Sequence, residues 1–100
     1  RYLYWGDIDR AGLNIFLSTA RANPDMDLEL FIPAYEEMLR LAQGRTIPDS
    51  ADERERMDDY AVIYGRVQQE LRASFERSIQ ENQRIPQEII TYAFLKNNMR

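Results

Sequence analysis

The apolar positions in the first part of the chain follow a strand period, then a helical period, then a strand period again. Tyr2–Trp5 is a short aromatic and apolar run, which favours a strand. Over Arg10–Ala22 apolar residues recur at helical spacing, and Asp9 stands in the position of an N-cap. Asp27–Ile32 alternates between polar and apolar residues and predicts a second strand. This order predicts a right-handed βαβ unit with parallel pairing.

The second part of the chain has the helical period. A short helix is predicted over Ala34–Ala42, and Gly44 is placed to end it. A long amphipathic helix is then predicted from about residue 51 to about residue 80. Its apolar positions recur at three-to-four spacing and are Met57, Tyr60, Tyr64, Val67, Leu71 and Phe75. Pro86 is placed to open a last helix from Gln87 to about Asn97.

These elements predict one α/β domain that is predominantly helical by residue count. Residues 1–44 form a βαβα unit and residues 51–97 a helical part, and 100 residues are enough for one small domain. Two parallel strands alone leave open sheet edges, whereas such strands normally lie inside a larger sheet. The chain also begins on a predicted strand without an initiating Met. We therefore expect a piece of a longer protein, or a domain that pairs with a second copy.

Two aspartates, Asp7 and Asp9, directly follow the first predicted strand. A period of two places their side chains on the same side of an extended segment, roughly 6–7 Å apart. Carboxylate oxygens at a strand end suit Mg²⁺ or Mn²⁺, which bind a few carboxylates together with water and substrate phosphate. Gly12 adds no side chain, and the helix that begins at Arg10 points its N-terminus at this position. A phosphodiester can therefore approach the backbone here.

The same two aspartates also have a purely structural interpretation. Asp9 can serve only as a helix cap, and Asp7 only as a turn residue that accepts hydrogen bonds from nearby amides. The spacing alone leaves both interpretations open.

The amino-acid composition limits the kinds of site and reaction that the chain can support. The chain contains no Cys and no His, which excludes disulfides, thiol nucleophiles, imidazole bases and the usual zinc sites. This composition fits a reducing, cytoplasmic compartment. The formal net charge is -4, so a DNA contact needs a local basic patch or a bridging metal. No apolar run approaches the ~20 residues of a membrane span, so we expect no membrane association.

Two segments resemble a known family. "YWGDIDRAGLNIF" (Tyr4–Phe16) resembles the D-x-D segment of Toprim domains, the metal-binding α/β domains of topoisomerases, primases and some nucleases. Its G-D-I-D-x-x-G form is similar to the Toprim-like C-terminal domain of the D subunit of Wadjet anti-plasmid systems. That family was formerly a domain of unknown function and is related to the A subunit of topoisomerase VI. "RIPQEII" (Arg84–Ile90) also resembles a family segment, so the resemblance spans nearly the whole chain and implies a partial Toprim-like fold.

The resemblance implies metal-dependent cleavage of DNA in the full-length protein, with the partner subunits of an SMC-like complex selecting the target. Asp7 and Asp9 match the family's metal-binding aspartates, so Mg²⁺ or Mn²⁺ held there would bind the scissile phosphate and activate water. The family's site also uses a glutamate from a strand upstream of the D-x-D, which this sequence does not contain. We therefore expect the chain alone to be inactive or nearly so.

Four further residues are candidates for phosphate contact or for support of the aspartates. Arg10 follows the pair directly, and Gly12 allows a phosphate to come close. Arg84 and Glu88 belong to the second segment with the resemblance, and Glu88 is a candidate third carboxylate. Both also have structural interpretations, since Glu88 can favour the start of the last helix and Arg84 can cover apolar surface with its stem.

Two other functions remain open. A haloacid-dehalogenase-like phosphatase also ends its first strand in D-x-D, but such enzymes have Thr or Val soon after the second Asp, where this chain has Arg10 and Ala11. A non-catalytic module that docks partner subunits, or that forms a homodimer, is compatible with the open sheet edges and the long helix.

Overall fold

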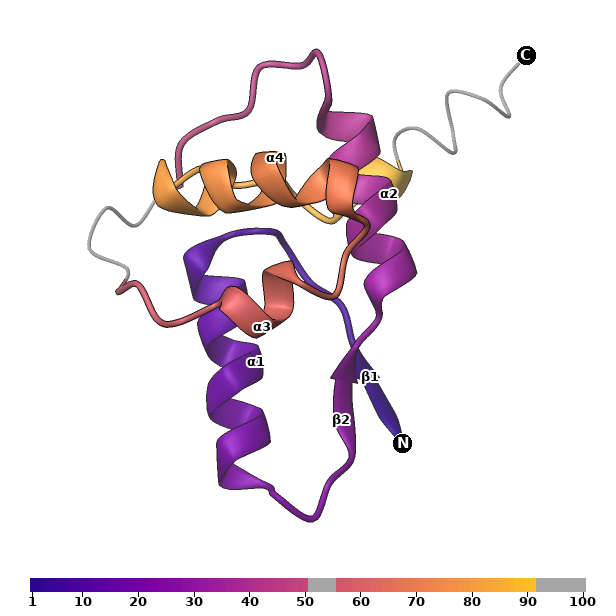
Figure 1. The fold of residues 1–100 in the computed structure, drawn as a ribbon, viewed down its shortest axis with the longest axis vertical. Helices are drawn as coiled ribbons and strands as arrows, with labels where there is room; N and C mark the ends of the chain where they lie inside the picture. The colour runs from indigo at the N-terminus through magenta and orange to yellow at the C-terminus, as the bar shows by residue number, and fades with distance from the viewer. Residues whose placement is uncertain (51–55, 92–100) are drawn as a thin grey trace.

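The computed structural model describes residues 1–50 and 56–91. Its strands and helices are β1 (Tyr2–Tyr4), α1 (Arg10–Ala22), β2 (Leu28–Leu30), α2 (Ile32–Ala42), α3 (Ala61–Tyr64) and α4 (Gln69–Gln80) (Figure 1). Residues 88–91 are also helical. Within the described ranges, no helix has the length and apolar character that a membrane crossing requires.

The N-terminal part of the fold is a two-stranded parallel sheet whose strands are joined by α1. Tyr2 lies opposite Leu28, and Tyr4 lies opposite Leu30. Each strand is shorter than predicted. The βαβ order, the parallel pairing and the predominantly helical α/β class are confirmed.

Local signals mark the ends of α1 and α2. Asp9 caps α1, and its side chain accepts a hydrogen bond from the Gly12 backbone N–H at 2.7 Å. Pro33 lies in the first turn of α2, which begins at Ile32 and therefore slightly earlier than predicted. Gly44 follows the end of α2 with a φ of 76°, in the left-handed region that favours glycine. The predicted cap and the predicted stop are both confirmed.

The prediction of one continuous helix from residue 51 to residue 80 is wrong. Residues 56–60 are not helical, α3 spans only 4 residues, and α4 begins at Gln69. The predicted start of that helix, at residues 51–55, lies outside the described residues. Residues 92–97 of the predicted last helix also lie outside them.

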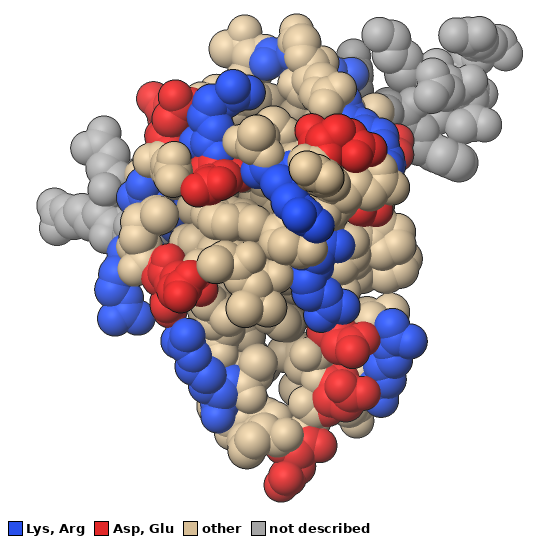
Figure 2. Space-filling model, in the orientation of Figure 1, with Lys and Arg blue, Asp and Glu red and all other residues tan. Residues whose placement is uncertain are grey.

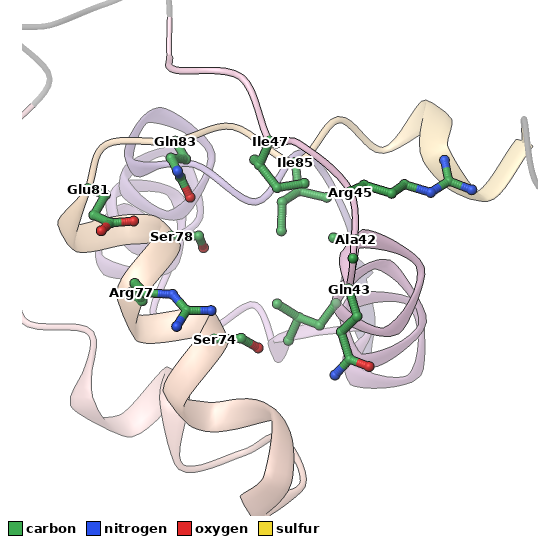
Figure 3. A pocket seen from close by; sticks show the side chains of 12 residues that line it. Ala42, Gln43, Arg45, Ile47, Ser74, Arg77, Ser78, Glu81, Gln83 and Ile85 are labelled. Atoms are coloured by element: carbon green, nitrogen blue, oxygen red, sulfur yellow. The ribbon is translucent and has the colours of Figure 1, made fainter.

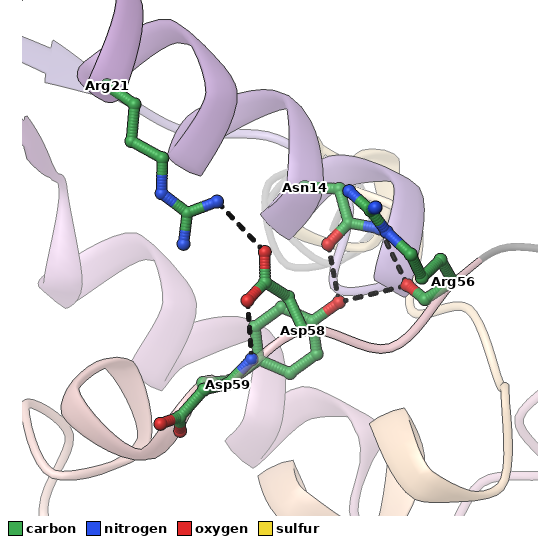
Figure 4. A network of polar contacts seen from close by, with 6 residues as sticks. Asn14, Arg21, Arg56, Asp58 and Asp59 are labelled. Carbon is green, nitrogen blue, oxygen red and sulfur yellow. Dashed lines mark hydrogen bonds and ion pairs between the residues drawn. The ribbon is translucent and has the colours of Figure 1, made fainter.

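Side-chain hydrogen bonds explain why the segment before α3 is not helical. Asp58 accepts from the Asp59 N–H at 2.7 Å, and Asp59 accepts from the first N–H of α3 at 3.0 Å. Such contacts are typical of a helix start. Asp58 also pairs with Arg21 of α1 at 3.0 Å. The Tyr60 hydroxyl donates to Asn14 of α1 at 2.6 Å, and together these contacts hold the segment against α1 (Figure 4).

A second interruption separates α3 from α4. The Gln68 N–H donates to the Glu36 carboxylate of α2 at 2.8 Å. Arg72 of α4 donates to the carbonyl oxygens of Gly65 and Val67, each at 3.0 Å. These bonds satisfy backbone groups that a continuous helix would pair internally. The chain can therefore turn here without leaving polar backbone atoms unpaired.

One hydrophobic core lies beneath α4. Its largest fully buried side chains are Tyr35, Tyr60, Phe75, Ile8, Leu13, Met38, Leu39, Leu71, Ile79 and Val67. Figure 1 shows α4 lying across the fold, next to α2 and above α3. Because Ile8 belongs to this core, the loop between β1 and α1 is anchored from the inside.

Candidate functional site

The loop between β1 and α1 carries its two aspartates on either side of a buried isoleucine. Ile8 is 0% exposed, and its N–H and C=O groups bond the backbone of Ile85 at 2.9 and 3.0 Å. Because side chains alternate along extended backbone, Asp7 and Asp9 face away from Ile8. Both line one surface hollow of about 340 Å³, together with Glu88. We call it the aspartate hollow.

Asp9 and Gly12 are packed closely at the start of α1. Asp9 is only 7% exposed, and its cap bond uses one carboxylate oxygen, Oδ1. A Cβ atom on Gly12 would lie 2.6 Å from the Asp7 carbonyl oxygen and 2.9 Å from Asp9 Oδ1. Any side chain here would therefore displace the aspartate loop.

Asp7 is held by the segment that follows α4. Its Oδ2 accepts from Arg84 Nε at 3.0 Å, and its Oδ1 accepts from the Gln87 backbone N–H at 2.8 Å. The Asp7 side chain is 24% exposed and the Arg84 side chain 43%, so the ion pair lies near the surface. The two segments that carry the resemblance are far apart in the chain and meet at this carboxylate.

Tyr4 lines the aspartate hollow, although it is not among the residues predicted for the site. Its hydroxyl lies 3.5 Å from the Gly12 carbonyl oxygen. Burial raises the pKa of Tyr4 above its ordinary value, and the negative charges of Asp9 and Asp7 raise it further. The hydroxyl is therefore protonated at neutral pH and can donate a hydrogen bond. Nothing in the strand spacing distinguishes Tyr4 from the other aromatic residues around it.

The remaining predicted residues lie in different surroundings. Glu88 and Gly12 line the aspartate hollow. Arg10 points to the end of α4, where it donates to the carbonyl oxygens of Ile79 and Gln80 at 2.9 and 2.8 Å. Its charge there balances the partial negative charge of a helix C-terminus. The structure therefore gathers Glu88 and Gly12 at the aspartates and places the Arg10 guanidinium elsewhere.

The oxygen donors of the aspartate hollow suit a hard divalent cation. Mg²⁺ is commonly bound through one or two carboxylates, with water and substrate phosphate completing its coordination. Within residues 1–50 and 56–91, no group of three or more Asp, Glu, Cys or His side chains is arranged to hold a metal ion. Among the described residues, Asp7 and Asp9 therefore do not belong to a closed protein cage for a metal ion.

A second hollow, of about 240 Å³, lies between α2 and α4 (Figure 3). Arg77 extends into it from α4, close to Ser74 and Ser78, and Ile47 and Ile85 contribute apolar wall. None of the predicted site residues lines it, and only one of its lining residues is a carboxylate. It does not offer the paired oxygen donors of the aspartate hollow.

The charged side chains on the face shown in Figure 2 are mixed in sign. Basic and acidic groups are interspersed, and neither covers that face. The whole chain has a formal net charge of -4. Contact with a nucleic acid would therefore depend on local chemistry and not on a broad attractive field.

A comparison with protein families matches nearly the whole chain. The model of the family described as "Wadjet protein JetD, C-terminal" matches residues 1–99. No curated protein and no solved structure matches the chain.

Proposed function

Since the chain belongs to the family of the C-terminal domain of the Wadjet protein JetD, we propose that it carries the metal-binding aspartates of a DNA endonuclease site. Membership of this family makes the chain a component of a Wadjet plasmid-defence system. The observation that supports this proposal is the placement of Asp7 and Asp9 in one hollow, between a parallel strand and the start of α1. Ligands of α/β proteins commonly bind at the carboxyl ends of parallel strands. The Toprim-like character of the domain is part of this proposal.

Five residues in or beside the aspartate hollow have a role in the proposed reaction. Asp7 and Asp9 would hold Mg²⁺ or Mn²⁺, which when bound stabilises charge on the scissile phosphate and provides an activated water. The Tyr4 hydroxyl, which donates over 3.5 Å to the Gly12 carbonyl oxygen, would exchange this long bond for one to a phosphate oxygen. Arg84 and the Gln87 N–H would fix the orientation of the Asp7 carboxylate.

The proposed site requires further ligands besides Asp7 and Asp9. The resemblance implies a glutamate from a strand upstream of the D-x-D, and membership of the family implies a multi-subunit Wadjet complex. We therefore expect cleavage of DNA by the full-length protein acting with SMC-like subunits, and little or none by this chain alone.

Titration with Mn²⁺ tests the proposal directly. We expect Asp7→Asn and Asp9→Asn each to weaken Mn²⁺ binding by at least about tenfold, because each removes one negative oxygen ligand. Asn caps helices about as well as Asp, so Asp9→Asn should keep α1 intact. Isothermal titration calorimetry measures the affinity, and Mg²⁺-dependent plasmid nicking by the full-length protein should be lost in the same variants.

Asp25→Asn is the matched control for this experiment, because Asp25 is exposed and lies outside the aspartate hollow. It removes the same charge and should leave Mn²⁺ affinity unchanged. Equal, weak binding by the parent chain and all three variants would contradict the metal site. That result would support the alternative function, a non-catalytic module that docks partner subunits or dimerises. The exposed Tyr2, Leu3 and Phe31 side chains are the observation that favours this alternative.

Removal of Arg84 should strengthen Mn²⁺ binding. Arg84 pairs with Asp7 at 3.0 Å, so its positive charge competes with a divalent ion for the same carboxylate. We expect Arg84→Ala to tighten Mn²⁺ binding several-fold in a calorimetric titration at low salt. Arg40→Ala is the control, because Arg40 has the same 43% exposure and pairs with Glu37, away from the hollow. Weaker binding by Arg84→Ala would instead show that orienting Asp7 matters more than the competing charge.

A further inference from the structure

The aspartate hollow has an apolar side that a metal site does not require. Trp5 is 39% exposed and Ile15 is 56% exposed, and both line the hollow together with Asp7 and Asp9. Mg²⁺ takes oxygen ligands from carboxylates, water and phosphate, so an indole ring is not among the groups that its site requires. The exposed surface of Trp5 beside two carboxylates therefore indicates a second group on the ligand, one that is flat and apolar.

Trp5 is fixed in place although it is exposed. Its indole Nε1–H donates to Met38 Sδ at 3.0 Å, and Met38 is a fully buried residue of α2. The next backbone N–H, of Gly6, donates to the hydroxyl of the buried Tyr35 at 3.1 Å. A ring held in this way loses little further freedom when a ligand binds, which favours affinity. Trp5 is therefore a preformed contact surface.

The charge of the hollow suits a nucleic acid only together with a bound divalent ion, because the carboxylates alone would repel its phosphates. Asp7, Asp9 and Glu88 all line it, and these carboxylates would repel an acidic peptide. An aromatic face accepts any nucleobase by stacking, because every base has a π-face. Gln87 also lines the hollow and carries an amide that can donate to and accept from a base edge.

From these contacts we infer that Trp5 stacks on an unpaired base next to the scissile phosphate. This inference rests on the proposed function, since it takes Asp7 and Asp9 as the site of the phosphate. A base inside an intact duplex is covered by its neighbours, so its face can reach Trp5 only after leaving the stack. The substrate class is therefore single-stranded DNA, or duplex DNA that has been locally opened.

Fluorescence gives a direct test, because Trp5 is the only tryptophan of the chain. The probe is an oligothymidylate of about eight nucleotides, titrated in Ca²⁺ so that metal is present without cleavage. We expect quenching of Trp5, with an affinity for the single strand at least about tenfold above that for a duplex of the same length. Equal quenching by single strand and duplex would overturn the inference.

Variants separate stacking from a general loss of structure. Measured by anisotropy of a labelled oligothymidylate, Trp5→Leu should bind about tenfold more weakly, whereas Trp5→Phe should keep most of the affinity. Phe31→Leu is the matched control, because Phe31 is 41% exposed and lies outside the aspartate hollow. Circular dichroism verifies that each variant is folded. Unchanged binding by Trp5→Leu would refute the stacking contact, as would quenching of Trp5 by a partner peptide and not by DNA.

The two proposals fail in different ways. If Asp7→Asn and Asp9→Asn bind Mn²⁺ as well as the parent chain does, the metal site is refuted. If the parent chain binds Mn²⁺ through these aspartates but the oligothymidylate does not quench Trp5, only the stacking contact is refuted.

Discussion

Replacement of Ile8 by alanine is expected to lower the free energy of unfolding by about 2–5 kcal/mol, the range for a buried large-to-small substitution. Ile8 is 0% exposed, and it anchors the loop that carries both aspartates. The free energy of unfolding of a small domain is only about 5–15 kcal/mol, so this substitution would remove a large part of it. Urea unfolding followed by circular dichroism measures the change.

The conservative variant Ile8→Val provides the control for this prediction. It keeps a branched side chain and removes one methylene, so its expected cost is only about 0.5–1.5 kcal/mol. The backbone bonds between Ile8 and Ile85 are unaffected by either substitution. An Ile8→Ala variant no less stable than Ile8→Val would contradict the packing of this side chain in the core.

Gly12→Ala is expected to have the second large effect. The new Cβ would meet the Asp7 carbonyl oxygen at 2.6 Å and Asp9 Oδ1 at 2.9 Å, so the loop or the helix start must shift. Overpacking of this kind typically costs about 1–3 kcal/mol. Because both contacts involve the aspartate loop, Mn²⁺ binding should weaken together with stability. Urea unfolding and calorimetric Mn²⁺ titration of the same preparation measure both effects.

Gly65→Ala is the matched control for this substitution. Gly65 has a φ of -68° and a ψ of -13°, and a Cβ there would meet no atom closer than 3.5 Å. Alanine accepts this backbone conformation, so stability should stay the same or rise by less than about 1 kcal/mol. If Gly12→Ala proved as harmless as Gly65→Ala, the close packing at the start of α1 would be disproved.

The ion pair between Asp7 and Arg84 joins the beginning and the end of the described chain. These residues are 77 positions apart, and the Gln87 N–H adds a second bond to the same carboxylate. The segment after α4 is therefore part of the aspartate hollow and not a separate appendage. In the proposed metal site, substitutions in this segment should change Mn²⁺ binding through the orientation of Asp7 and through the positive charge of Arg84 beside it.

The long helix shows why apolar spacing was not sufficient to predict the second half of the chain. Apolar residues at three-to-four spacing are compatible with one helix or with two shorter ones. The interruptions depend on Asp58 with Arg21 and on Gln68 with Glu36, pairs that are 37 and 32 positions apart. Such pairs contribute only after folding has brought their elements together, so a local pattern does not contain them.

Local preferences alone were enough to predict the βαβ order, the Asp9 cap and the end of α2 near Gly44, and to select the carboxylates of Asp7 and Asp9 as candidates. Each of these features acts within one helical turn or between alternate residues of a strand, so it is written in adjacent positions. The surroundings of those carboxylates depended on the fold. Packing of the core brought Arg84 to Asp7, turned Arg10 toward α4, and left Tyr4 and Trp5 lining the hollow. These contacts join distant segments, and their energy arises only when the core has formed.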